Sequence, residues 1–185
     1  MENKLKIFQH IKADSKNKSA LTQKGFTLFE ILASIAIIGI MALIFYPNII
    51  GTLETRKLES SAREILTNLQ RAKFQAVRTK LNHRVRFMAP GEAWFFVIER
   101  EDNPADWNTM PGFIRKSIPS QLFVNVDFPN QAVEFSPLGL VSNFSSLQNS
   151  ITLQSLKLTT YGQSDQRIVS VLAGGSIQYT KTESE

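Results

Sequence analysis

The longest apolar segment of the chain lies near its N-terminus and carries a single charge. It extends for twenty residues from Phe26 to Phe45, and Glu30 is its only ionisable residue. A helix of that length rises about 30 Å, which matches the hydrocarbon thickness of a bilayer. A buried core helix is the alternative interpretation, but a helix that is apolar on all sides over this length favours a membrane span.

Periodic apolar positions resume after Pro47, from about Thr52. They recur mostly at steps of three or four, which is typical of one face of an amphipathic helix: Leu58, Ala62, Ile65, Leu69, Ala72, Ala76 and Leu81. Together with the apolar segment, they predict one long helix over residues 26–81. We expect it to be bent or loosened near Pro47, which lacks a backbone N–H, with Gly51 as a further weak point.

The pattern after this helix changes to short segments rich in β-branched and aromatic residues, separated by Pro and Gly turn signals. These predicted strands are His83–Met88, Trp94–Arg100, Leu122–Phe128, Ala132–Phe135, Ile151–Thr160, Arg167–Leu172 and Ser176–Thr180. Their spacing predicts an antiparallel sheet. The expected fold class is therefore α+β, with a long N-terminal helix, half in the membrane and half amphipathic, packed on an antiparallel β-sheet domain.

Four parts of the chain follow from these patterns. We expect a leader at 1–25, a transmembrane helix at 26–50, an amphipathic helix at 51–82 and a β-rich globular domain at 83–185.

Basic residues are concentrated before the apolar segment. Residues 1–25 contain six lysines and two acidic residues, whereas the remaining 160 residues are almost neutral, with 15 basic and 14 acidic side chains. The positive-inside rule places the leading segment in the cytoplasm and the C-terminal part outside it. The apolar segment is longer than the core of an ordinary secretory signal, and no Ala-x-Ala pattern closes it.

Glu30 lies where burial of a charge is most expensive. An ionisable residue inside a span costs a few kcal/mol or more unless it is paired, so it indicates a functional site. Lys24, Gly25 and Phe26 form the boundary between the polar leader and the apolar segment, and Glu30 lies one helical turn after Phe26. A cut there would leave an amine on Phe26, which is the natural counter-ion of Glu30 in its own chain or in a neighbouring one.

The string Lys-Gly-Phe-Thr-Leu-Phe-Glu, followed by an apolar helix, resembles the type III signal of type IV pilins and type II secretion pseudopilins. The resemblance implies that a prepilin peptidase cleaves after Gly25 and that Phe26 becomes the N-methylated first residue. It also implies that Glu30 pairs with the N-terminal amine of a neighbouring subunit during assembly. The leader of 25 residues is longer than many in the family.

The same resemblance implies the surroundings of the chain. It would cross the bacterial inner membrane once, with a periplasmic C-terminal domain, and lipid would surround the helix before assembly. Its partners would be other pilin or pseudopilin subunits and an inner-membrane assembly platform.

The remainder of the mature chain resembles the minor pseudopilin H and FimT-like group. The likeness is carried by Leu69–Lys73, Gln75–Val77, Val85–Phe87, Phe135–Gly139 and Ala173–Ile177. It implies a minor pseudopilin, a structural subunit of the periplasmic filament of a type II secretion system. The alternative is a FimT-like minor pilin of a type IV pilus that contacts DNA during uptake.

Six cations are the best candidates for contact with a polyanion: Arg71, Lys73, Arg78, Lys80, Arg84 and Arg86. Phosphate binding needs clustered Lys or Arg, but a solvated helix face is the simpler interpretation. DNA-uptake members of the FimT-like group carry arginines in their final strands. Lys181 is the only basic residue among residues 174–181 of this chain, and the acidic residues Glu183 and Glu185 follow. The sequence therefore argues against DNA as a partner.

The composition gives little support to catalysis. Cysteine is absent, which excludes a thiolate metal site and a cysteine nucleophile, and the two histidines, His10 and His83, lie far apart. A metal cluster or a Ser-His-Asp triad would have to rest on one of them. We expect no catalytic residue and a structural protein rather than an enzyme. A signal-anchored enzyme remains a third hypothesis, and it predicts that residues 1–25 stay on the mature protein.

Four carboxylates fall close together in the sequence and could supply oxygen ligands to a hard cation: Glu99, Glu101, Asp102 and Asp106. No ordered ligand-loop spacing appears among them. Residues 103–108 are interpreted more simply as a polar turn between strands. We therefore expect no metal ion and no cofactor.

Overall fold

The computed structural model describes residues 25–160 and 162–182. The chain divides into two compact units, one ending at Phe45 and the other starting at Tyr46. In the described residues the elements are α2 (Leu28–Thr79), β1 (His83–Met88), β2 (Phe95–Asn103), β3 (Asp106–Thr109), β4 (Lys116–Ser117), β5 (Leu122–Asp127), η2 (Pro129–Gln131), β6 (Ala132–Phe135), β7 (Ser150–Ser155), α3 (Leu156–Thr160), β8 (Gln166–Val171) and β9 (Ile177–Thr182).

Helix α2 belongs to both units and continues through Pro47 and Gly51 without a break in its helical assignment. A proline removes one backbone hydrogen bond, and helical residues on both sides can tolerate that loss. The helix ends at Thr79 because Lys80 has a left-handed backbone, with φ of 60°. The Lys80 N–H still donates to the Ala76 carbonyl at 3.0 Å, as at a helix C-terminus.

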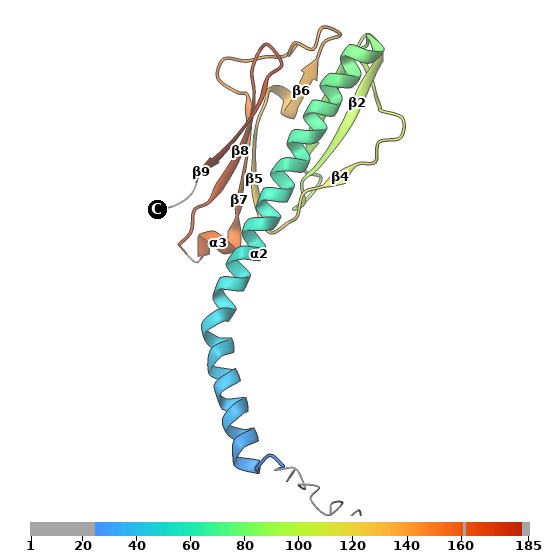
Figure 1. Ribbon diagram of the computed structural model, residues 1–185. Helices are drawn as coiled ribbons and strands as arrows, with labels where there is room; N and C mark the ends of the chain where they lie inside the picture. The colour runs from blue at the N-terminus through green and yellow to red at the C-terminus, as the bar shows by residue number, and fades with distance from the viewer. Residues whose placement is uncertain (1–24, 161, 183–185) are drawn as a thin grey trace, which may run out of the picture. The chain divides into compact units, whose positions relative to one another are not determined.

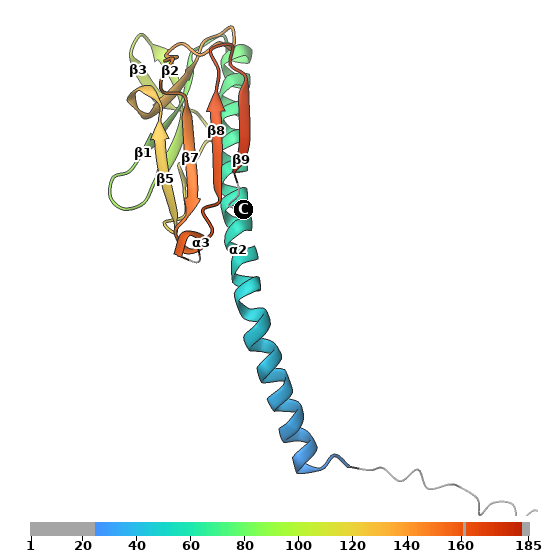
Figure 2. The ribbon, with the colours of Figure 1, turned by 90° about the vertical axis from the view of Figure 1, so that its left-hand side faces the viewer.

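Two antiparallel sheets follow the helix. Sheet A has the strand order β3-β2-β1-β6, with β4 also paired to β2, and sheet B has the order β5-β7-β8-β9. Figure 2 shows the four strands of sheet B side by side. The β8–β9 pairing runs in regular register from Gln166 opposite Thr182 to Val171 opposite Ile177. The fold is α+β with antiparallel sheets, as the sequence predicts.

One hydrophobic core joins the second half of α2 to both sheets, and Figure 1 shows this part of the helix lying along them. Sheet A contributes Phe87 and Phe96, whose ring centres lie 6.0 Å apart, and sheet B contributes Leu153 and Val169. The helix contributes six fully buried side chains: Leu58, Ala62, Ile65, Leu69, Ala72 and Ala76. The predicted apolar face is therefore confirmed at these six positions. Leu81 lies beyond the end of α2 and is partly exposed, so its placement on that face was wrong.

The segment Asp106–Thr109 is a strand, β3, so the interpretation of residues 103–108 as one polar turn was wrong. The turn is shorter and includes Ala105, whose φ is 65°. Trp107 then pairs with Glu101 across the ladder. The guanidinium carbon of Arg84 lies 4.2 Å from the centre of the Trp107 ring. This cation–π contact links the edge strand β3 to β1 across β2 within sheet A.

The predicted strand Ile151–Thr160 is also corrected. Only its first part is extended, and the chain turns into the short helix α3 after Ser155. The Ser155 hydroxyl accepts a hydrogen bond from the Leu158 N–H at 3.4 Å, which caps the first turn. Leu158 is buried and anchors the turn.

Candidate functional site

The start of α2 is fixed by a local cap. The Thr27 hydroxyl accepts a hydrogen bond from the Glu30 N–H at 3.2 Å, and the Thr27 carbonyl accepts from the Ile31 N–H at 3.2 Å. Thr27 is therefore the N-cap and Glu30 the third helical residue, the spacing of a capping box. An acidic side chain in the first turn also interacts favourably with the helix dipole. The apolar periodicity does not predict this cap, although the Thr-x-x-Glu spacing of residues 27–30 is a sufficient sequence signal for it.

Glu30 and the two residues predicted to flank the cleaved bond are all exposed at this end of the helix. Apart from its chain neighbours, no atom of the described residues lies within 4 Å of a Cβ added at Gly25, and the residue is exposed. The Phe26 side chain is 78% exposed. Within the described part of the chain, the Glu30 carboxylate has no ion-pair partner. The structure thus leaves these three residues, including the Glu30 carboxylate, accessible to another molecule.

The first half of α2 exposes apolar surface over its whole length. Leu28–Phe45 is the stretch of the described residues that is long and apolar enough to cross a membrane by length and composition. Its large side chains reach 80% exposure at Phe29. An exposed contiguous apolar surface typically marks a site of contact with a membrane or with other chains. Gly39 lies within it, and a Cβ there would also meet nothing within 4 Å.

The second half of α2 is attached to sheet B by a group of charged side chains. One oxygen of Glu59 accepts hydrogen bonds from Arg167 Nε on β8 at 3.0 Å and from the Tyr179 hydroxyl on β9 at 2.5 Å. Its other oxygen accepts from Arg63 Nε at 2.7 Å. The Arg167 side chain is completely buried. A buried charge requires such a partner, so this group fixes the position of sheet B on the helix.

The titration of this group follows from its contacts. The hydrogen bond from Tyr179 is the largest influence on Glu59; burial opposes it, and Arg167 and Arg63 add to it, so that the pKa of Glu59 falls to about 2. Burial, together with the bond to Glu59, raises the pKa of Tyr179 to about 12. Both groups therefore keep their charge states over a wide pH range, as in a structural contact.

Arg84 and Arg86, two of the cations considered for polyanion contact, lie on β1 beside carboxylates. Glu99 accepts from Arg84 Nε at 2.6 Å and from Arg86 Nη2 at 2.9 Å, and Arg84 Nη1 lies 3.7 Å from a Glu134 oxygen. These guanidinium groups are thus largely neutralised inside the chain.

The other four cations lie on or just after α2. The guanidinium of Arg71 lies 5.6 Å from the centre of an aromatic ring, and Lys73 Nζ donates to a backbone carbonyl of the β8–β9 turn at 2.9 Å. Arg78 and Lys80 have no carboxylate within ion-pair distance in the described part of the chain. The six cations therefore do not act as one phosphate-binding cluster in this structure, and their contact with a polyanion stays a prediction.

The carboxylates considered for a cation are occupied by hydrogen-bond donors. Glu101 accepts from the Asn82 amide at 2.6 Å and from the Ala105 N–H at 2.8 Å, and the Asn82 bond is the main cause that lowers its pKa. Asp102 accepts from Arg100 Nε at 2.6 Å. Within the described residues, no group of three or more His, Cys, Asp or Glu side chains could hold a metal ion.

The structure describes only one of the two histidines, His83. His83 is a buried residue whose Nδ1 lies 3.1 Å from the Leu81 carbonyl oxygen, and burial lowers its pKa. His10 lies outside the described residues.

Comparisons with known proteins agree with this geometry. Residues 21–46 match the family described as the prokaryotic N-terminal methylation motif, and this segment includes Gly25, Phe26 and Glu30. Two structures of the minor pseudopilin EpsH from the type 2 secretion system of Vibrio cholerae share the fold. One gives a TM-score of 0.51 at 11% identity, covering 68% of this chain and 97% of that one. The other gives 0.52 at 12% identity, covering 70% of this chain and 98% of that one.

The chain thus carries an N-terminal methylation motif at residues 21–46 and shares its fold with these pseudopilin structures. No curated protein sequence matches this pilin-like chain significantly. Its likeness to EpsH therefore rests on three-dimensional structure, and its likeness in sequence rests on the N-terminal motif.

Proposed function

We propose that the chain is a minor pseudopilin, a structural subunit of the periplasmic filament of a type II secretion system. Two features support this. The N-terminal methylation motif precedes a helix that needs an apolar environment, and the folded domain has a pseudopilin-like architecture. The observation that carries the proposal is Glu30, an exposed carboxylate at the start of an apolar helix with no ion-pair partner in the described residues.

The proposed cycle begins in the inner membrane. The positive leader stays in the cytoplasm, the apolar half of α2 crosses the bilayer once, and the folded domain lies in the periplasm. A prepilin peptidase cuts the bond between Gly25 and Phe26 and methylates the new amine. The exposed backbone at Gly25 suits this step, because a peptidase must approach the scissile bond closely.

Assembly replaces lipid by protein around the apolar helix. Glu30 would pair with the N-terminal amine of a neighbouring subunit, which removes two unpaired charges from a region of low dielectric constant. Apolar contact alone is non-directional, whereas one charge pair sets the relative height of two helices. In this role Glu30 acts in register and assembly, and the chain needs no catalytic residue of its own.

The partners would be other pilin or pseudopilin subunits and an inner-membrane assembly platform. The alternative, a FimT-like minor pilin of a type IV pilus that contacts DNA, would need cations available for phosphates. Arg84 and Arg86 are already paired with Glu99, so we favour the secretion filament.

The proposal is tested by identifying the N-terminal residue of the full chain in its native host and by measuring its incorporation into filaments. Intact mass and N-terminal sequencing should give a chain that begins at N-methylated Phe26. Glu30→Ala should leave insertion and cleavage intact and abolish incorporation into filaments. A chain that still begins at Met1 would refute the proposal.

A matched control separates the charge of Glu30 from the cap. Thr27→Val removes the capping hydroxyl, at a cost of about 1 kcal/mol of helix stability, and keeps the carboxylate. It should still assemble. Equal loss of assembly in both variants would show that the first helical turn matters rather than the ion pair.

A further inference from the structure

In the part of the chain that the structure describes, sheet B ends in a strand, β9, whose outer edge has no partner strand. β9 pairs with β8 over six residues without a bulge, and no other described strand pairs with it. Edge strands of native proteins are usually short, bulged, covered or interrupted by Pro and charges, because an open edge accepts another strand. β9 has the sequence Ile-Gln-Tyr-Thr-Lys-Thr, with no Pro and one charge. It is therefore well suited to strand addition.

The backbone groups that face this edge can be assigned from the ladder. At the β8–β9 turn the Leu172 N–H donates to the Ser176 carbonyl at 2.9 Å. Hydrogen-bonded pairs alternate along an antiparallel ladder, so Gln178 directs its N–H and C=O to β8. Ile177 and Tyr179 direct theirs to the open edge. An extended segment placed there would find donors and acceptors two residues apart, as in a sheet.

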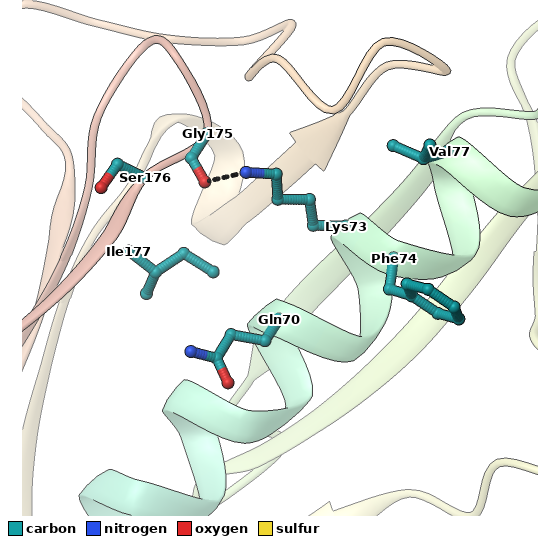
Figure 3. A pocket seen from close by; sticks show the side chains of 7 residues that line it. All are labelled: Gln70, Lys73, Phe74, Val77, Gly175, Ser176 and Ile177. Carbon is teal, nitrogen blue, oxygen red and sulfur yellow. Dashed lines mark hydrogen bonds between the residues drawn. The ribbon is translucent and has the colours of Figure 1, made fainter.

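A groove of about 460 Å3 lies at the start of the same strand, between β9 and α2. Figure 3 shows Lys73 reaching from the helix to the turn at Gly175, and Gln70 extending from the helix toward Ile177. Phe74 also lines the groove and is 63% exposed. The groove would take one side chain of a strand added to β9. The open edge and the groove are thus two separate observations that specify the same kind of ligand.

The groove is held in shape by a close contact of two turns. Gly175 has a φ of 71°, and a Cβ at this position would clash with the backbone carbonyl of Gly139. Lys73 Nζ donates to the Gly175 carbonyl at 2.9 Å from the helix side. A groove that exists before binding spares a ligand part of the ordering cost.

We propose that β9 and this groove bind an extended segment of another subunit of the filament by strand addition, so that the segment continues sheet B beside α2. This inference rests on the proposed function. The segment would carry an uncharged side chain opposite Ile177, for the groove. Its nearby charges would be acidic, because Lys73 has no carboxylate within ion-pair distance in the described residues. The backbone supplies most of the binding, and the groove supplies selectivity.

A second copy of this chain fits the site less well. Antiparallel pairing of two β9 strands centred on Tyr179 sets Lys181 of one copy opposite Ile177 of the other. Lys181 would then lie at the mouth of a groove that already contains Lys73. A lysine side chain does not match the uncharged side chain that the groove would take, so we infer a subunit of different sequence.

The experiment uses the full chain in its native membrane. A photo-crosslinking phenylalanine analogue replaces Gln70, which points into the groove, and in a matched control replaces Gln154 on the central strand β7. We expect a crosslink from position 70, and none from position 154, to another filament subunit identified by mass spectrometry. A crosslink from position 154 alone would place the contact on the face of sheet B and overturn the assignment to the β9 edge.

Two further variants test the mode of binding. Ile177→Pro removes an edge N–H without removing a bond to β8 and should reduce the crosslink from position 70 roughly tenfold, whereas Ile177→Val should retain it. Because the proline could disturb the strand, Lys73→Glu serves as a second probe: it leaves the backbone of β9 unchanged, reverses the charge in the groove and removes the bond to the Gly175 carbonyl. Lys73→Glu should also weaken the binding of an acidic partner segment and so reduce the crosslink. Unchanged crosslinking in both variants would overturn the proposal.

The same samples separate this inference from the proposed function. A chain that begins at Phe26, enters filaments and crosslinks to a second copy, to an exported protein or to nothing overturns strand addition alone. A chain that still begins at Met1 overturns the proposed function and the inference together.

Discussion

The two halves of helix α2 use their apolar residues in opposite ways. In the second half, six apolar side chains are fully buried against two sheets, and Glu59 is paired with Arg167 and Tyr179. In the first half, the apolar side chains are exposed, and Glu30 has no ion-pair partner in the described residues. One half is satisfied within the chain, and the other requires partners from outside it.

This difference separates stability from assembly. Substitutions in the second half should act on the free energy of unfolding, because the contacts that they remove are present in the isolated chain. Substitutions in the first half should leave folding unchanged and act on insertion or filament formation. Glu59 and Glu30 provide the sharpest contrast, because they are the same residue type in one helix.

The largest effect on folding is expected from Glu59→Ala. It leaves Arg167 completely buried without its carboxylate, and it leaves the Tyr179 hydroxyl without its acceptor. Breaking a buried pair by removing one partner costs about 3–5 kcal/mol. Urea unfolding of the full chain in detergent, followed by tryptophan fluorescence, measures this loss.

Two matched controls surround this prediction. Glu64→Ala removes an exposed ion pair with Lys116, at 3.4 Å and with 42% of the Glu64 side chain exposed, and should cost less than about 1 kcal/mol. Glu30→Ala should not change the free energy of unfolding of the domain. If Glu59→Ala and Glu64→Ala were equally mild, the buried group would not be what holds sheet B on the helix.

Acid should weaken the second half of α2 in a defined pH range. The pKa of Glu59 is about 2 in the folded chain, against an ordinary value of 4.5. The unfolded chain therefore takes up the proton first, so this contribution to stability is complete above pH 4.5 and is lost as the pH falls toward 2. We expect a loss of about 2 kcal/mol, after allowance for a side chain that is 29% exposed.

The free energy of unfolding against pH, for the native chain and for Glu59→Gln, checks this range. The variant should lose less stability between pH 4.5 and 2. His83 is buried with a lowered pKa, so its effect begins as the pH falls below 6.5 and is common to both chains. Parallel curves below pH 4.5 would contradict the assignment to Glu59.

The sequence predicts the parts of this molecule that depend on short-range patterns. The spacing of apolar residues locates the buried face of α2 from Leu58 to Ala76, and the strand β1 is predicted with its observed bounds. Contacts between distant segments are not visible in the same way. Arg167 and Tyr179 lie 108 and 120 residues from Glu59 in the sequence.

A partial signal for this contact was nevertheless present. Arg167 occupies the same alternating face of β8 as Val169 and Val171, so its parity places a charge in the core. A buried arginine must have a partner, although parity does not say which carboxylate supplies it. Trp107 gave the weaker signal, because a strand of four residues between polar neighbours resembles a turn until Arg84 is seen above its ring.

The smallest expected effect concerns Gly39, in the exposed half of α2. Beyond the adjacent helix backbone, a Cβ at this position meets no atom of the described residues within 4 Å, and Ala is favoured over Gly in a helix by about 1 kcal/mol. Gly39→Ala should therefore leave insertion, cleavage and domain stability unchanged. Filament incorporation should stay within about twofold of the native level, because lipid or loosely packed helices easily accommodate one methyl group. The amount of processed protein in sheared filaments measures this incorporation.

Gly174→Ala is the matched control for Gly39→Ala, since its Cβ also meets open space but lies in the folded domain. A large loss of incorporation for Gly39→Ala alone would show that a neighbouring helix packs closely at residue 39, and that the outside partners of the first half are as specific as the inside partners of the second.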